Sequence, residues 1–102
     1  MAFTVVTKKR FENKIKKLLE YLVMDWQDKV AVDFLLKLNH TIDVVSNNPG
    51  VGLKIKDLNN TRSTLITKHN RLYYRIEEDT IIILNMIDTR LSPKKNPFKK
   101  PA

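Results

Sequence analysis

The stretch RSTLITKHNRLYYRIEEDTIIILNMID, residues 62–88, decides the fold because β-branched and aromatic residues dominate it. Two short polar breaks, His69-Asn70 and Glu78-Asp79, predict three strands at about residues 62–68, 71–77 and 80–88. Breaks this short allow only a tight turn, so neighbouring strands must run antiparallel. We therefore expect a three-stranded meander in this half of the chain.

Two segments before this stretch repeat their apolar residues at helical spacing. The first pattern, which includes Phe11 and Ile15, predicts a helix at about residues 8–24, and the second predicts one at about residues 26–46. Only one or two residues separate them, so they should fold back as an antiparallel hairpin. A β-prone segment at residues 3–7 comes first, which gives the order β-α-α-β-β-β. The expected fold class is α+β, a small antiparallel-type sheet with the helix hairpin packed on one face.

The chain has 102 residues, enough for one domain with one core. We assign residues 1–91 to this domain and residues 92–102 to a basic C-terminal tail. The tail contains four lysines and three prolines and little that could pack, so we expect it to be extended or mobile. Residues 51–61 have no clean hydrophobic period and are expected to form a loop.

The composition excludes several classes of protein. The absence of cysteine removes disulfide scaffolds, thiol catalysis and Cys-ligated zinc, and a total of two histidines argues against a metal site. A membrane-spanning helix needs about 20 consecutive apolar residues, and no apolar run in the sequence approaches this length. The apolar N-terminal segment is too short for a signal peptide. We therefore expect a cytoplasmic protein without metal, cofactor or membrane contact.

The formal net charge of +8 is unevenly distributed along the chain. Residues 1–20 carry +4 and residues 51–102 carry +6, whereas residues 21–50 carry −2. A polyanionic partner would bind the two basic terminal segments. A soluble protein of high isoelectric point without a nucleic-acid partner fits the composition equally well.

Three consecutive cations, Lys8, Lys9 and Arg10, open the first expected helix. Positive charge in the first turn opposes the helix dipole, at a cost of some tenths of a kcal/mol for each residue. A solvated helix face is the simpler interpretation. Contact with RNA or with an acidic protein is the alternative.

The turn at His69-Asn70 predicts the register of the first hairpin. It places Arg62 opposite Glu77 and Thr64 opposite Arg75. Side chains alternate along a strand, so one face of the sheet is polar and the other apolar. The apolar face should pack under the helices, and its members are Leu65, Leu72, Tyr74 and Ile76.

The polar face gathers Arg62, Tyr73 and Arg75, with Arg90 at its far end. Guanidinium groups bind phosphate oxygens and can stabilise the charge that develops during strand cleavage. A tyrosine can stack on a base or transfer a proton. The simpler alternative is pairing with neighbouring acids, namely Arg75 or Arg62 with Glu77 and Arg90 with Asp88.

Several short motifs occur along the chain in a characteristic order and spacing. The turn Asn-Pro-Gly-Val-Gly, residues 48–52, comes after the second expected helix. Arg62 opens the first of the three strands, LYYRI (72–76) forms the second, and Asp-Thr-Arg (88–90) ends the third. In this order and spacing, over about residues 3–95, the chain resembles the RelE/ParE toxin superfamily. The resemblance implies a small sheet with a helical hairpin on one face.

The resemblance also implies the toxin of a type II toxin–antitoxin system. RelE-like members cleave messenger RNA in the ribosomal A site without a metal, which makes a ribosome-dependent endoribonuclease (an mRNA interferase) the first hypothesis. ParE-like members inhibit DNA gyrase, which is the second hypothesis. A non-toxic basic binding module on the same fold is the third. The expected partner is a cognate acidic antitoxin with an amphipathic C-terminal segment.

Residue roles follow from the same resemblance. The candidate catalytic residues are Arg62, Arg90, Lys54 and Tyr73, with the cations binding phosphate and Tyr73 serving in stacking or acid–base chemistry. The candidate nucleic-acid-binding residues are Lys56, Arg75, Lys94 and Lys95. RelE-like toxins carry a tyrosine near the C-terminus, where this chain has only Phe98 as its nearest ring. A general base for the ribose 2′-hydroxyl is therefore not identified.

Overall fold

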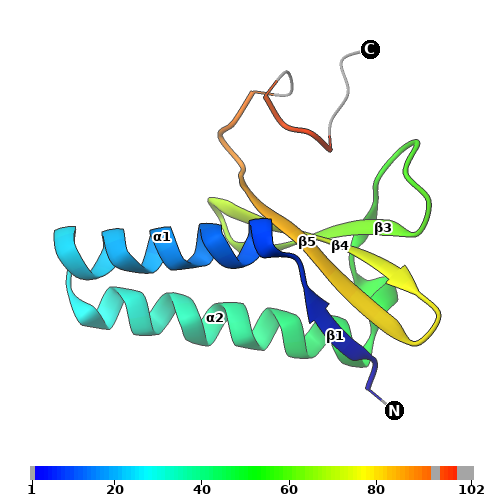
Figure 1. The fold of residues 1–102 in the computed structure, drawn as a ribbon, viewed down its shortest axis with the longest axis horizontal. Coiled ribbons are helices and arrows are strands. Elements are labelled where there is room, and N and C mark those ends of the chain that lie inside the picture. Colours follow the sequence, from blue (N-terminus) through cyan, green and yellow to red (C-terminus); the bar gives the residue numbers. More distant parts are fainter. Residues whose placement is uncertain (1, 93–94, 99–102) are drawn as a thin grey trace.

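The computed structural model describes residues 2–92 and 95–98, which form a helix hairpin beside a five-stranded sheet (Figure 1). The expected order β-α-α-β-β-β is confirmed, and the segment expected to be a loop also contains a 3₁₀ turn and a two-residue strand. The elements are β1 (Thr4–Thr7), α1 (Lys9–Asp25), α2 (Asp28–Asn47), the 3₁₀ turn η1 (Pro49–Val51), β2 (Leu53–Lys54), β3 (Thr61–Thr67), β4 (Asn70–Glu77) and β5 (Thr80–Asp88).

The strands lie in the order β1-β5-β4-β3-β2. β3, β4 and β5 form the expected antiparallel meander, and β2 pairs antiparallel with β3. β1 instead pairs parallel with β5, from Thr4 beside Thr80 to Thr7 beside Ile83. The sheet is therefore mixed rather than wholly antiparallel. The connection from β1 to β5 runs through both helices and three further strands, which is long enough to bring the two strands side by side in the same direction.

The helix hairpin covers one face of the sheet (Figure 1), and α1 packs on β5 while α2 packs on β3. A fully buried Leu, Ile or Phe side chain contributes about 1.5–3 kcal/mol, so the apolar layer between helices and sheet holds the fold together. Its buried members are Phe11, Phe34, Leu38, Val45, Ile66, Leu72, Tyr74, Ile81, Ile83 and Met86. We call the opposite face the open face; it carries Ser63, Arg71, Tyr73, Arg75 and Asn85.

The β3–β4 turn closes one residue earlier than the sequence predicts. Thr67 pairs with Asn70, so the turn contains Lys68 and His69 rather than His69 and Asn70. The Thr67 hydroxyl accepts hydrogen bonds from the His69 N–H at 3.2 Å and from the Asn70 side-chain amide at 3.1 Å. These contacts hold the turn, and a second irregularity between Leu65 and Thr67 shifts the register further.

The irregularity between Leu65 and Thr67 reverses the faces of the β3 side chains that precede it. Leu65, which was expected in the core, is 46% exposed, and Ile66 is buried instead. Arg62 pairs with Tyr74, whose ring belongs to the core, so Arg62 lies on the helix side of the sheet. The prediction that Arg62 shares a face with Tyr73 is therefore wrong.

The Tyr74 hydroxyl joins the sheet to the segment that follows α2. It donates a hydrogen bond to the Pro49 carbonyl at 2.7 Å and accepts one from the Gly52 N–H at 3.0 Å. Burial raises the pKa of the Tyr74 phenol, which keeps it protonated as a donor. Any side chain at position 52 would collide with this hydroxyl and approach the Ser63 carbonyl to 2.9 Å, so the site requires glycine.

Removal of the Tyr74 hydroxyl should destabilise the protein. Tyr74→Phe leaves the Pro49 carbonyl and the Gly52 N–H without their partner, so we expect the free energy of unfolding to fall by about 1–3 kcal/mol. Urea denaturation followed by circular dichroism measures the change. The matched control is Tyr21→Phe on an exposed tyrosine, with an expected change below about 0.5 kcal/mol. Equal losses in the two variants would contradict this role for Tyr74.

Candidate functional site

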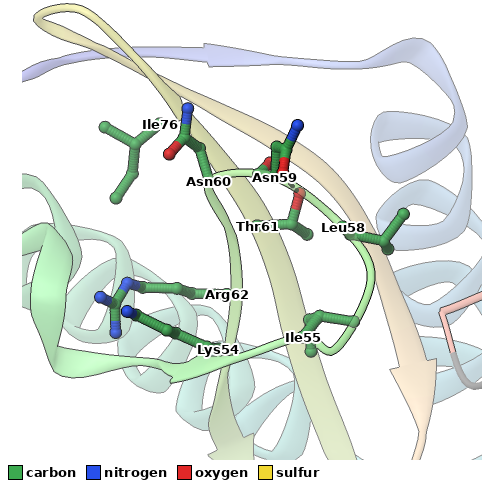
Figure 2. A pocket seen from close by; sticks show the side chains of 8 residues that line it. All are labelled: Lys54, Ile55, Leu58, Asn59, Asn60, Thr61, Arg62 and Ile76. Atoms are coloured by element: carbon green, nitrogen blue, oxygen red, sulfur yellow. Dashed lines mark hydrogen bonds between the residues drawn. The ribbon is translucent and has the colours of Figure 1, made fainter.

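A pocket of about 390 Å³ lies where the loop after β2 returns to β3 (Figure 2). We call it the edge pocket; it is lined by Lys54, Ile55, Leu58, Asn59, Asn60, Thr61, Arg62 and Ile76. Two backbone hydrogen bonds fix the loop, from the Ile55 N–H to the Thr61 carbonyl at 3.0 Å and from the Ile76 N–H to the Asn60 carbonyl at 2.9 Å. Asn60 adopts a positive φ of 55°, which asparagine tolerates well. These two hydrogen bonds and the backbone conformation of Asn60 therefore define the shape of the edge pocket.

Lys54 and Arg62 supply the positive charge of the edge pocket. They are cross-strand partners on β2 and β3, and Figure 2 shows their side chains extending in the same direction. Arg62 Nη1 donates to the Gly52 carbonyl at 2.7 Å and to the Gly50 carbonyl at 3.3 Å. Arg62 thus holds the η1 turn, and together with Lys54 it can bind a carboxylate or a phosphate group.

Tyr73 lies on the open face beneath part of the C-terminal tail. The rings of Tyr73 and Phe98 are stacked, with centroids 4.1 Å apart and planes 10° apart. The Asn96 side-chain amide donates to the Tyr73 hydroxyl at 3.3 Å. Asn96 is buried and Tyr73 is only 1% exposed. The expectation that the tail has little to pack is therefore wrong for Asn96 and Phe98, and Tyr73 is covered rather than presented to solvent.

Arg90 makes a two-pronged ion pair with Asp88. Its Nε lies 3.0 Å from Oδ1 of Asp88, and its Nη2 lies 2.8 Å from Oδ2. The hydrogen bonds from Arg90 lower the pKa of the Asp88 carboxyl from 3.8 to about 2. The pairing that the sequence left open as the simpler alternative is therefore present in the structure.

The four candidate catalytic residues do not converge on one point. Lys54 and Arg62 share the edge pocket, which Ile76 also lines near the end of β4. Arg90 follows Asp88, which pairs with Asn70 at the opposite end of β4. The fourth, Tyr73, faces away from the helix side on which Arg62 lies.

The candidate nucleic-acid-binding residues also lie in different places. Lys56 is exposed on the loop after β2, and Lys95 is exposed in the tail. Arg75 is on the open face, and its Nε lies 2.9 Å from Oε1 of Glu77, a contact of opposite charges outside hydrogen-bond geometry. Lys94 lies outside the described residues.

Sequence reasoning missed the contact that positions the edge pocket. Tyr74 was expected only as a core residue, and its hydroxyl role was not foreseen. The available signal was Gly52 in the Asn-Pro-Gly-Val-Gly turn, because a glycine beside a turn can mark a close approach of another group.

Within residues 2–92 and 95–98, no three His, Asp or Glu side chains gather as a metal site would need. In the same part of the chain, neither helix combines the length and the apolar character required to cross a membrane.

The helix hairpin on one face of a mixed five-stranded sheet matches several solved structures. A chain of the chromosomal ParDE system from P. aeruginosa matches with a TM-score of 0.67 and 14% identity, over 85% of this chain and 96% of that chain. The YoeB dimer from Staphylococcus aureus matches with a TM-score of 0.61 and 19% identity, over 83% of this chain and 94% of that chain. A YoeB/ParE toxin from Agrobacterium tumefaciens matches with a TM-score of 0.59 and 17% identity, over 83% of this chain and 96% of that chain. These similarities establish the fold.

The family follows from the sequence of the chain itself. A family model described as the ParE toxin of the type II toxin–antitoxin system, parDE, matches residues 5–90. The chain belongs to this family, so it is a type II toxin that has an antitoxin partner. Comparison with the curated proteins gave no match.

The Asp88 carboxyl provides a direct test of the ion pair with Arg90. In the native protein we expect it to titrate with a pKa of about 2, and in Arg90→Ala we expect the pKa to return toward 3.8. Because the folded pKa is depressed, the pair stabilises the fold above about pH 4, and this contribution is lost as the pH falls toward 2. Carboxyl-carbon NMR measures the titration, and Arg75→Ala serves as the control that should leave it unchanged. An Asp88 pKa near 3.8 in the native protein would disprove the pairing.

Proposed function

We propose that this toxin inhibits DNA gyrase by binding it and does not cut RNA. The observation that carries the proposal is the separation of Lys54 and Arg62 from Tyr73 and from Arg90. Cleavage of a phosphodiester through the ribose 2′-hydroxyl needs a proton acceptor and several cations around one phosphate. A set of residues spread over both faces and both ends of the sheet is poorly suited to that reaction.

The contacts of the individual residues support the same conclusion. The Tyr73 phenol is buried and bonded to Asn96, and Arg90 is bound to Asp88 in two places. One guanidinium nitrogen of Arg62 donates hydrogen bonds to the carbonyls of Gly50 and Gly52 at the η1 turn. Each of these side chains has a structural partner within the chain. The ParE family model, which covers most of the chain, agrees with a toxin of the gyrase-inhibiting kind.

The edge pocket is the surface that we assign to the target protein. Lys54 is exposed and stands beside the Arg62 guanidinium, so the pair suits an acidic side chain of a partner. The pocket floor includes Ile55, Leu58 and Ile76, which can receive apolar atoms next to that acid. The antitoxin, by the same electrostatic reasoning, is an acidic protein that neutralises part of the +8 charge.

Ribosome-dependent cleavage of messenger RNA is the second candidate. It is favoured by the proximity of Lys54 and Arg62, since two cations beside one cavity could hold a scissile phosphate. It lacks an identified general base among the described residues around the edge pocket.

Two assays decide between these functions. In a supercoiling assay with purified toxin and gyrase, we expect inhibition that rises with toxin concentration. In cells that express the toxin, primer extension should find intact messenger RNA. Transcripts cut during translation together with normal supercoiling would instead establish the ribonuclease. Unimpaired growth together with negative results in both assays would favour a non-toxic binding module.

The role of the edge pocket is tested by charge reversal. Lys54→Glu should raise the toxin concentration needed for half-inhibition of gyrase by about tenfold or more, because a buried like-charge contact costs more than 1.4 kcal/mol. Lys29→Glu on the exposed face of α2 makes the same change of net charge far from the pocket and should have little effect. Equal inhibition by both variants would show that the target binds elsewhere.

A further inference from the structure

We propose that a second basic site, beside the start of α1, binds a single strand of nucleic acid. This site is a groove of about 380 Å³, and we call it the basic groove. Its lining residues are Lys8, Lys9, Arg10, Leu84, Asn85 and Phe98. None of them was used in the proposed function, and the inference does not depend on gyrase inhibition.

The cations of the basic groove are placed at a cost to the fold. They occupy the N-terminal end of α1, where the helix dipole is positive and Lys8, the N-cap, makes no side-chain capping bond. Neither of the two ion pairs found among the described residues involves them. An anion bound in the groove would offset this unfavourable arrangement.

The groove is built by the backbone of β5. The Lys8 N–H donates to the Ile83 carbonyl at 2.9 Å, which fixes the start of α1 against that strand. The next residue, Leu84, is an extra residue in the strand, because Ile83 pairs with Tyr74 and Asn85 pairs with Tyr73. Such bulges redirect side chains and are common beside functional sites.

The side-chain amide of Asn85 has a donor, Nδ2, for which the described residues offer no acceptor. Its side chain is buried, with 3% of the residue exposed, and it lines the groove. Its Oδ1 accepts a bond from the Met86 N–H at 2.8 Å. No described residue accepts a hydrogen bond from its Nδ2, so this amide can donate to a carbonyl or phosphate oxygen of a ligand.

The apolar part of the groove suits an unpaired base. Phe98 is stacked on Tyr73, which holds the ring in place, and Phe98 and Leu84 both line the groove. Aromatic side chains next to a row of cations are the usual platform for single-stranded nucleic acid. An acidic peptide would satisfy the cations but offers no regularly spaced planar rings to the aromatic wall.

The basic groove and the edge pocket are separate sites. The groove borders β5, which pairs with β1 at one edge of the sheet, whereas the edge pocket is built on β2 and β3 at the other edge. Variants of the groove therefore leave Lys54 and Arg62 untouched, and loss of strand binding can be told apart from loss of gyrase inhibition.

The test uses the purified full chain and fluorescein-labelled 12-nucleotide strands of thymidylate and uridylate, followed by fluorescence anisotropy. Lys8→Ala/Lys9→Ala/Arg10→Ala should weaken binding at least about tenfold. It should also reduce the slope of log affinity against log salt by about 2, since each lost phosphate contact removes about 0.7. The control Lys16→Ala/Lys17→Ala/Lys29→Ala removes the same charge from exposed helical positions and should have a much smaller effect. The two probes show whether DNA or RNA is preferred.

The aromatic wall is tested separately. Phe98→Ala should weaken binding about tenfold, and Phe98→Tyr, which keeps a ring, should restore it. Circular dichroism confirms that each variant is folded. Equal losses in the groove variant and its charge-matched control would overturn the proposal, because binding would then follow net charge alone. The proposal would also be overturned if a 12-residue polyglutamate displaced the labelled strand as effectively as the unlabelled strand does. The groove would then be a site for acidic peptides.

Discussion

The hydroxyl of Tyr74 is the contact on which the functional surface depends. It stands at the end of a buried ring and binds both sides of the turn after α2, through the Pro49 carbonyl and the Gly52 N–H. Arg62 binds further carbonyls of the same turn from the neighbouring strand. Together these two side chains place β2 on the sheet edge, and with it Lys54. The Tyr74 hydroxyl and Arg62 thus hold the segment that leads into the edge pocket, alongside the backbone pairing of β2 with β3.

Three arginines of this protein make contacts within their own chain. Arg62, Arg75 and Arg90 each contact a carbonyl or a carboxylate of their own chain. The planar guanidinium suits such fixed internal partners. Lys14 also has an internal partner, because its ammonium donates to the Met86 carbonyl at 2.8 Å. Residues that look like a phosphate-binding set in the sequence are thus largely committed to holding turns and strand ends. The exposed positive charge that is left lies on lysines and at the start of α1.

The C-terminal segment gives the open face its present character. Residues 95–98 cover Tyr73 through one aromatic stack and one amide hydrogen bond, and Phe98 then forms a wall of the basic groove. The same contact removes a phenol from solvent and presents a ring to a neighbouring groove. Because the groove and the edge pocket lie toward opposite edges of the sheet, a protein partner and a nucleic-acid strand would not compete for one surface.

The sequence alone determined the order of elements, the helix hairpin and the apolar character of Leu72, Tyr74 and the β5 core, because hydrophobic period and turn residues are local properties. Its motifs also indicated the toxin family that the family model confirms. The register of β3 against β4, in contrast, emerged only in the folded structure. The turn at Lys68-His69 displaces the partner of each β3 residue by two positions, which leaves its side chain on the same face, and the irregularity between Leu65 and Thr67 displaces it by one more, which moves Arg62 to the other face. A one-residue shift in pairing reverses the faces of the side chains beyond it, so the membership of the site could not be read from spacing.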